Sequence, residues 1–115
     1  MTERARKGQA AEERACRYLR SLGYEIAARN FRCRQGEIDI VAKNGDTVVF
    51  VEVRSKARGV YGTAAETVDW AKRAKLMKAA RYYALVKALD CPLRFDVVAI
   101  DGTSLDHVED AFQEN

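Results

Sequence analysis

The sequence is poor in the residues that build metal-thiolate, disulfide and histidine-dependent nucleophilic sites. Its 115 residues include only three cysteines, one histidine and one proline. Cys16, Cys33 and Cys91 are odd in number, far apart and outside any CxxC pair, which argues against a zinc site and a disulfide framework. His107 stands alone near the end of the chain, so a Ser-His or Cys-His nucleophile is not expected.

Long apolar runs are also missing. No segment reaches the roughly 18 apolar residues of a membrane-spanning helix, and residues 1–15 are charged and lack an apolar signal core. Hydrophobic residues make up 48% of the chain, which is enough for a core. We therefore expect a cytoplasmic protein with no membrane partner. Residues 1–115 should form one domain, with a core over about 8–100 and an acidic tail over 101–115.

Charge is unevenly distributed, although the formal net charge is only +3. Lysine and arginine dominate residues 1–35 and 54–87, whereas acidic residues dominate the intervening segment 36–53 and the end of the chain, 88–115. Basic surface around an acidic centre suits a metal-dependent enzyme that acts on a polyanion. Solvated helix faces would give the same composition, so charge alone leaves both interpretations open.

Hydrophobic periodicity predicts two helices. The apolar residues of segment 3–22 share one face of a helix that stops at Gly23. Residues 63–66 form a capping box, which predicts that a second helix begins near Ala64 and runs to about Leu89.

Four strands complete the predicted order α-β-β-β-α-β. One strand is expected over residues 24–33 and one over 93–100. Two more flank Asn44 and Gly45, a strong hairpin signal. The polar tail from Asp101 is expected to contain at most a short helix around 108–112. The predicted fold is an α/β sandwich, with a mixed sheet of about four strands flanked by helices.

The hairpin gathers carboxylates at one end. If the asparagine–glycine pair forms the turn, Glu37 lies opposite Glu52, whereas a longer loop places Asp39 opposite Glu52. Asp39 and Glu52 share a face in both registers because side chains alternate along a strand. Like charges across a strand pair are destabilising. Either a divalent cation binds there, since Mg²⁺ takes carboxylate ligands, or Arg54 and Lys56 on the same face neutralise the cluster.

Two helix residues direct charge toward the expected core. Glu12 falls at the edge of the apolar stripe of the first helix, and Lys72 at the centre of the stripe of the second. Inward charges need partners, so we expect Lys72 to meet the hairpin carboxylates and to bind the scissile phosphate or orient water. Lys75 flanks it. Alternatively, each side chain packs its stem and extends its charged end into solvent.

These motifs resemble those of a known group of nucleases. GEIDIVA, followed one hairpin later by FVEVRSK, resembles the Asp…Glu-x-Lys signature of the restriction-endonuclease-like superfamily. Over residues 8–100 the chain more closely resembles the YraN family of small bacterial nuclease-like proteins, which is similar to archaeal Holliday-junction resolvases. The match includes AEERACRYLRSLGYEIAARNFR, the helix residues Val68, Lys72 and Leu76, and RFDVVAI.

The resemblance implies a restriction-endonuclease-like fold and a metal site. Asp39 and Glu52 would bind Mg²⁺ or Mn²⁺, with the Val53 carbonyl as a third ligand. Glu12 matches the first-helix glutamate of the family, and Lys72 matches a lysine in its second long helix. Glu12 and Glu37 would complete the metal shell or orient water.

One position departs from the superfamily pattern. Arg54 occupies the place of the signature lysine. Arginine stays protonated and cannot act as a base, but it can bind phosphate and stabilise the transition state. Lys56, two residues further along the same face, would supply a titratable amine.

We therefore expect a metal-dependent endonuclease that acts on DNA, in particular structured or branched DNA. The residues expected to contact nucleic acid are Arg54, Lys56, Arg58, Lys72 and Lys75. Cutting a junction requires two active sites, so a homodimer is expected. One alternative is a nucleic-acid-binding module with weak or lost catalysis, and a weaker one is a protein-interaction adaptor.

Overall fold

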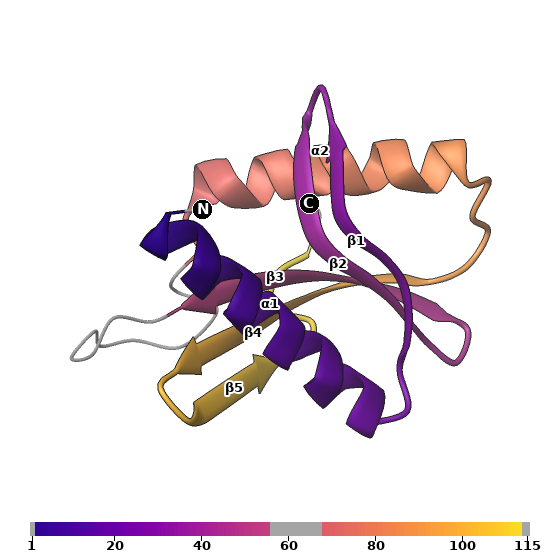
Figure 1. Cartoon of the computed structure of the whole chain (residues 1–115). Helices are drawn as coiled ribbons and strands as arrows, with labels where there is room; N and C mark the ends of the chain where they lie inside the picture. Colours follow the sequence, from indigo (N-terminus) through magenta and orange to yellow (C-terminus); the bar gives the residue numbers. More distant parts are fainter. Residues whose placement is uncertain (1, 56–67, 114–115) are drawn as a thin grey trace.

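The computed structural model describes residues 2–55 and 68–113, which form two helices and one five-stranded sheet (Figure 1). In chain order the elements are α1 (Glu3–Ser21), β1 (Glu25–Cys33), β2 (Gly36–Asn44), β3 (Thr47–Ser55), α2 (Trp70–Val86), β4 (Leu93–Asp101) and β5 (Ser104–Val108). The strands lie side by side in chain order; β3 and β4 are parallel and the other neighbours antiparallel. The predicted sandwich with a mixed sheet and flanking helices is confirmed, with one strand more than expected.

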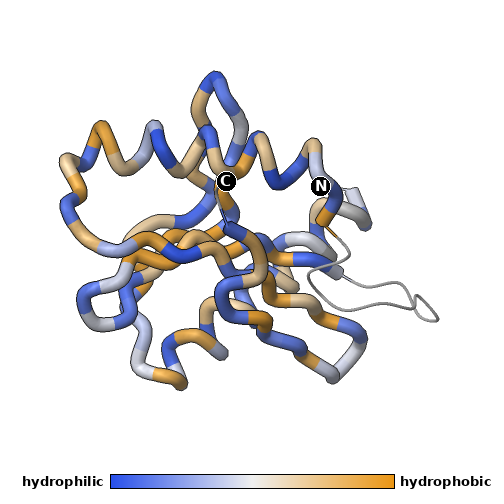
Figure 2. The backbone as a smooth tube through the Cα atoms, turned by 180° about the vertical axis from the view of Figure 1, so that it is seen from behind, coloured by the Kyte–Doolittle hydropathy of each residue, from blue (hydrophilic) through white to orange (hydrophobic). Residues whose placement is uncertain are grey.

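One helix covers each face of the sheet. Leu19 of α1 packs in one apolar cluster with Val51 of β3, whereas Leu76 of α2 packs in a second cluster with Phe50. Figure 2 shows apolar stretches along the central strands, while polar and apolar residues alternate along both helices. Full burial of one such side chain contributes about 1.5–3 kcal/mol, so the two clusters hold β3 firmly between the helices. Within the described residues, neither helix has the length and apolar character needed to cross a membrane.

Helix α2 begins later than predicted. Asp69 caps it, because its carboxylate accepts a hydrogen bond from the backbone N–H of Lys72 at 2.8 Å. The helix therefore begins at Trp70 and not near Ala64. The predicted capping box at residues 63–66 lies outside the described residues. The late start leaves Lys72 in the first turn of the helix.

The C-terminal segment forms a strand where a polar tail was expected. Asp101 pairs with Ser104, so Gly102 and Thr103 form a tight turn from which β5 runs back along β4. Gly102 has a φ of +59°, a conformation that glycine adopts without steric cost. The predicted short helix around 108–112 is not present in the described part of the tail.

A buried carboxylate fastens this segment to the sheet. Asp96 of β4 is fully buried and accepts two hydrogen bonds from Arg94, at 2.8 and 2.9 Å. His107 Nε2 lies 2.7 Å from Asp96 Oδ2, and the backbone N–H of Asp110 donates to Oδ1 at 3.0 Å. His107 Nδ1 lies 3.0 Å from the hydroxyl of Tyr18 on α1. The lone histidine thus links α1, β4 and β5.

Candidate active site

The turn between β2 and β3 sets which carboxylates meet. Gly45 and Asp46 form it, one residue later than predicted, because Gly45 takes the first turn position with a φ of +61°, as in a type II′ turn. The resulting register brings Asp39 level with Glu52. The register that placed Glu37 opposite Glu52 is therefore wrong. The alternative register is correct, although a two-residue turn produces it and not the longer loop that was expected with it.

The regular pairing of β2 with β3 ends next to Asp39, whose side chain contacts the backbone of β3. The β2–β3 pairs run as far as Ile40 opposite Val51. One residue further, Asp39 Oδ2 accepts a hydrogen bond from the backbone N–H of Val53 at 2.8 Å, in place of a strand carbonyl. Ile38 packs in the α2 cluster and Ile40 in the α1 cluster, so β2 twists at this residue. Figure 1 shows the β1–β2 hairpin rising from the sheet toward α2.

Glu52 is the most unusual side chain of the site. It lies on the α2 face of β3 and is only 3% exposed. Its Oε1 is 3.7 Å from Nζ of Lys72, whereas no group donates a hydrogen bond to its buried Oε2; a hydrogen bond to the Asp39 carboxylate, which raises the pKa of Glu52, requires the protonated acid. Burial first, and then the charge of Asp39, raise the pKa of Glu52 from 4.5 to about 7, although Lys72 and Arg54 act in the opposite direction. The positive charge near Glu52 therefore does not compensate for its burial and for the charge of Asp39.

The carboxyl group of Asp39 is also incompletely compensated by positive charge. Burial raises the pKa of its carboxyl group above the usual range, even though the Val53 N–H and the charge of Lys72 favour the ionised form. Two carboxyl groups with raised pKa values, held side by side on adjacent strands, are costly for a fold that needs only packing. Such pairs are typical of functional sites.

Glu12 approaches the same region from α1. It is only 9% exposed, and its Oε1 lies 3.5 Å from Nε of Arg29 without forming a hydrogen bond. Burial first, and then the charge of Asp39, raise its pKa. The structure therefore places Glu12 within electrostatic range of Asp39.

The cations of the site come from α2 and β3. Lys72 reaches Glu52 from the first turn of α2, as predicted from the helical stripe, and its side chain is 35% exposed. Arg54 lies on the same face of β3 as Glu52 and is half-buried. Lys56 and Arg58, which were expected to contact nucleic acid, lie outside the described residues.

Glu37 has a partner of its own. Its carboxylate lies 3.4 Å from Nε of Arg32 and its side chain is 49% exposed. Across residues 2–55 and 68–113, no group of three or more His, Cys, Asp or Glu side chains is arranged to hold a metal ion. What Asp39 and Glu52 offer is two carboxylates, with the Val53 carbonyl next to them in sequence. Mg²⁺ is commonly held by one or two carboxylates, water and substrate phosphate, so this oxygen donor set fits it.

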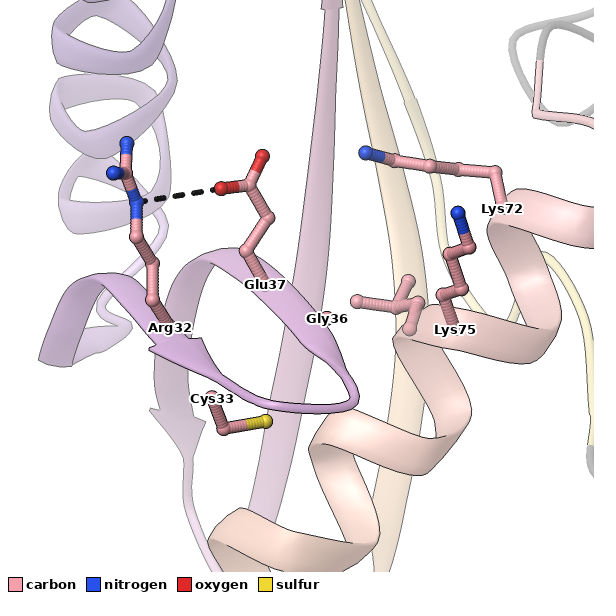
Figure 3. Close-up of a pocket in the computed structure, with 7 residues that line it drawn as sticks. Arg32, Cys33, Gly36, Glu37, Lys72 and Lys75 are labelled. Atoms are coloured by element: carbon pink, nitrogen blue, oxygen red, sulfur yellow. Dashed lines mark ion pairs between the residues drawn. The ribbon is translucent and has the colours of Figure 1, made fainter.

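A pocket of about 340 Å³ opens beside Lys72, between the tip of the β1–β2 hairpin and α2 (Figure 3). Its lining residues are Arg32, Cys33, Gly36, Glu37, Lys72, Lys75 and Leu76. Lys75, expected to contact nucleic acid, lies on its wall. Sequence reasoning missed Arg32 and Cys33, because no local pattern shows that the hairpin tip packs against α2. The one sequence feature that could have indicated this contact is Gly36, the glycine between these two residues and Glu37.

Comparison with known proteins identifies the family. Residues 11–100 match the sequence model of the uncharacterised protein family UPF0102. The chain belongs to this family. The match confirms the resemblance to the YraN family that the motifs indicated.

Relatives in the family are similar over nearly their whole length. A UPF0102 protein of Persephonella marina is 43% identical over 107 residues, which cover 92% of each chain. One of Dechloromonas aromatica is 43% identical over 106 residues, or 92% of this chain and 88% of the relative. One of Syntrophus aciditrophicus is 42% identical over 118 residues, or 98% and 93%. These names assign the UPF0102 family and no activity.

Proposed function

We propose that this UPF0102 protein is a metal-dependent endonuclease that hydrolyses phosphodiester bonds in structured or branched DNA. The observation that carries the proposal is Glu52, a buried carboxylate beside a second carboxylate, with one oxygen unpartnered. A buried ion pair kept only for structure normally has its oxygens hydrogen-bonded. A divalent cation would supply both the missing partner and the missing positive charge.

Each residue of the site has a role in this proposal. Asp39 and Glu52 would hold Mg²⁺ or Mn²⁺, with the Val53 carbonyl as a further ligand. The bound ion would lower the pKa of water and offset phosphate charge.

The remaining side chains would act on the phosphate and the water. Lys72, within reach of Glu52, would bind the scissile phosphate, and Arg54 would offset charge in the transition state. Glu12 would orient the attacking water. The basic residues around the site would hold the DNA backbone without reading its sequence.

The test is cleavage of a labelled panel of duplex, single-stranded, flap and four-way-junction DNA in Mg²⁺, Mn²⁺ or EDTA. Glu52→Gln and Asp39→Asn should lose cleavage while remaining folded. Asp46→Asn removes an exposed carboxylate from the opposite end of the same hairpin and should cleave like the wild type. Equal cleavage by wild type and Glu52→Gln would show that the catalytic site lies elsewhere.

Arg54 supports a second candidate, a nucleic-acid-binding module without catalysis, because a residue that cannot act as a base stands at the lysine position. This candidate predicts salt-sensitive DNA binding that is the same in EDTA and in Mn²⁺. Calorimetric titration with Mn²⁺ separates the two candidates. The nuclease binds the ion at millimolar concentration or below and loses that binding in Glu52→Gln, whereas the binding module does not bind it.

A further inference from the structure

The pocket beside Lys72 shares a wall with the candidate active site. Lys72 lines the pocket and also lies 3.7 Å from Glu52. In Figure 3, Glu37 and Lys72 point into the same space from the hairpin and from α2. A group bound in this pocket would therefore be the immediate neighbour of a phosphate held by Lys72.

The hairpin and α2 meet in a fixed arrangement at the base of the pocket. A Cβ atom added at Gly36 would lie 3.1 Å from the carbonyl oxygen of Lys75 and 3.3 Å from its Cβ. Such contacts are tighter than most real Cβ contacts, so glycine at this position lets the hairpin approach the backbone of α2 closely. The β1–β2 tip is also anchored by Phe31, whose ring lies 5.1 Å from that of Tyr83 on α2. The pocket is thus formed before any ligand binds.

The chemistry of the lining is divided between apolar and charged groups. Leu76, Gly36 and Cys33 supply apolar or weakly polar surface. Three cations line the same pocket, namely Arg32, Lys72 and Lys75. Among the lining residues that the structure describes, Glu37 is the only carboxylate, and it is paired with Arg32 at 3.4 Å. Apolar surface suits the face of a base, lysines suit a phosphate, and a carboxylate can accept a hydrogen bond from the exocyclic amine of cytosine or adenine.

We propose that this pocket holds one unpaired nucleotide of the DNA, directly next to the phosphate that is cut. The proposal rests on the proposed nuclease function and narrows its substrate to DNA with an unpaired nucleotide at the cleavage position. The volume of about 340 Å³ lies at the small end of the range for ligand pockets, about 300–1,000 Å³. It has room for one nucleotide and not for a base pair. A base inside a duplex would have to leave the stack to enter, at a cost of a few kcal/mol.

Cys33 provides a direct probe of occupancy that does not depend on catalysis. It is a free, half-buried cysteine in the lining, and Cys91, also free and half-buried, lies in a different pocket and serves as an internal control. The rate of alkylation of each thiol is measured by mass spectrometry in EDTA at low salt. The ligands are a short oligodeoxycytidylate and a blunt DNA duplex at equal nucleotide concentration.

We expect the single strand to slow alkylation of Cys33 several-fold and to leave Cys91 unchanged, whereas the duplex protects Cys33 much less. Lys75→Ala should reduce the protection. Lys78→Ala removes the same charge from an exposed position of α2 outside the pocket lining and should not reduce it. Equal protection by both ligands, no protection by either, or equal effects of the two variants would each overturn the proposal.

Failure of the pocket and failure of the nuclease give different results. Metal-dependent cleavage without protection of Cys33 refutes the nucleotide pocket alone. Protection of Cys33 by single strands without cleavage in either metal retains the pocket and refutes catalysis. A working nuclease with this pocket should also cut flap and single-stranded substrates faster than a perfect duplex, and Lys75→Ala should reduce that preference where Lys78→Ala does not.

Discussion

Replacing the central carboxylate of the candidate site should make the metal-free protein more stable. Glu52→Gln keeps the shape of the side chain but replaces the carboxyl group with an amide that does not ionise. In the folded chain the pKa of Glu52 is raised from 4.5 to about 7, so between these values the native state binds more protons than the unfolded state. The contribution of Glu52 to the stability of the wild type must therefore fall as pH rises through that range. The variant lacks this loss.

The size of the effect follows from the pKa. One pKa unit corresponds to about 1.36 kcal/mol, so the rise from 4.5 to about 7 corresponds to roughly 3 kcal/mol at pH 8. The attraction of Lys72 is already contained in this pKa, because Lys72 lowers it. We expect Glu52→Gln to be about 3 kcal/mol more stable than the wild type at pH 8, and equal to it near pH 4.

The assay is urea unfolding in EDTA, followed by circular dichroism, at a series of pH values from 4 to 8.5. Mn²⁺ at a hundred times its Kd should cancel most of this difference at pH 8, because it stabilises the protein that binds it by about 2.7 kcal/mol. Asp46→Asn, from the exposed turn, should follow the wild-type curve. Equal or lower stability of Glu52→Gln at pH 8 in EDTA would refute the reasoning, since it would show that Glu52 is well compensated in the free protein.

Four further predictions concern other residues. Asp96→Asn should cost about 3–5 kcal/mol in urea unfolding, because it removes the buried carboxylate that pairs with the half-buried guanidinium of Arg94. Burial alone would raise the pKa of Asp96, but the hydrogen bonds that it accepts hold that pKa below its usual range; the stability that it confers should therefore be present above about pH 4 and decline as acid titration proceeds below this value. Gly36→Ala should cost about 1–3 kcal/mol by the same assay, because its Cβ meets the Lys75 backbone. Lys72→Met removes a charge that lowers the pKa of Glu52, so Mn²⁺ binding measured by calorimetry should shift to higher pH.

The elements were predictable because periodicity and turn chemistry act locally. The strands of the β2–β3 hairpin and the inward position of Lys72 follow from alternation and from the helical stripe. The turn lies one residue later than predicted because Gly45 can take either of two turn positions. It can follow Asn44 as the second residue of the turn or precede Asp46 as the first. That single residue decides whether Glu37 or Asp39 meets Glu52.

A local turn signal precedes the fifth strand, but the acidic composition of the segment concealed it. Gly102 and Thr103 form the turn, and glycine at the first position of a two-residue loop is a hairpin signal, but the acidic residues after them indicated a solvated tail. What the sequence could not show is that His107 meets the buried Asp96. That contact is long-range, and a histidine in a polar segment carries no periodic pattern.

The pocket could not be predicted for the same reason. Arg32 and Cys33 lie at the tip of one hairpin and Lys75 on a helix much later in the chain, so their contact depends on how far β2 bends at Asp39. The bend follows from the carboxylate, which takes the hydrogen bond of Val53 and ends the strand pairing. The acidic residue that was predicted as a metal ligand is thus also the residue that allows the hairpin to reach α2.

The two most deeply buried carboxylates of the described chain provide an internal comparison for the site. Asp96 is fully buried, accepts hydrogen bonds from Arg94 and from a backbone N–H, contacts His107, and has a lowered pKa. Glu52 is almost as deeply buried but has one partnerless oxygen and a raised pKa. The same fold therefore satisfies a buried carboxylate where the role is structural. Glu52, in contrast, is left unsatisfied beside Asp39. This difference supports the proposed cation site, and the Mn²⁺ dependence of stability measures it directly.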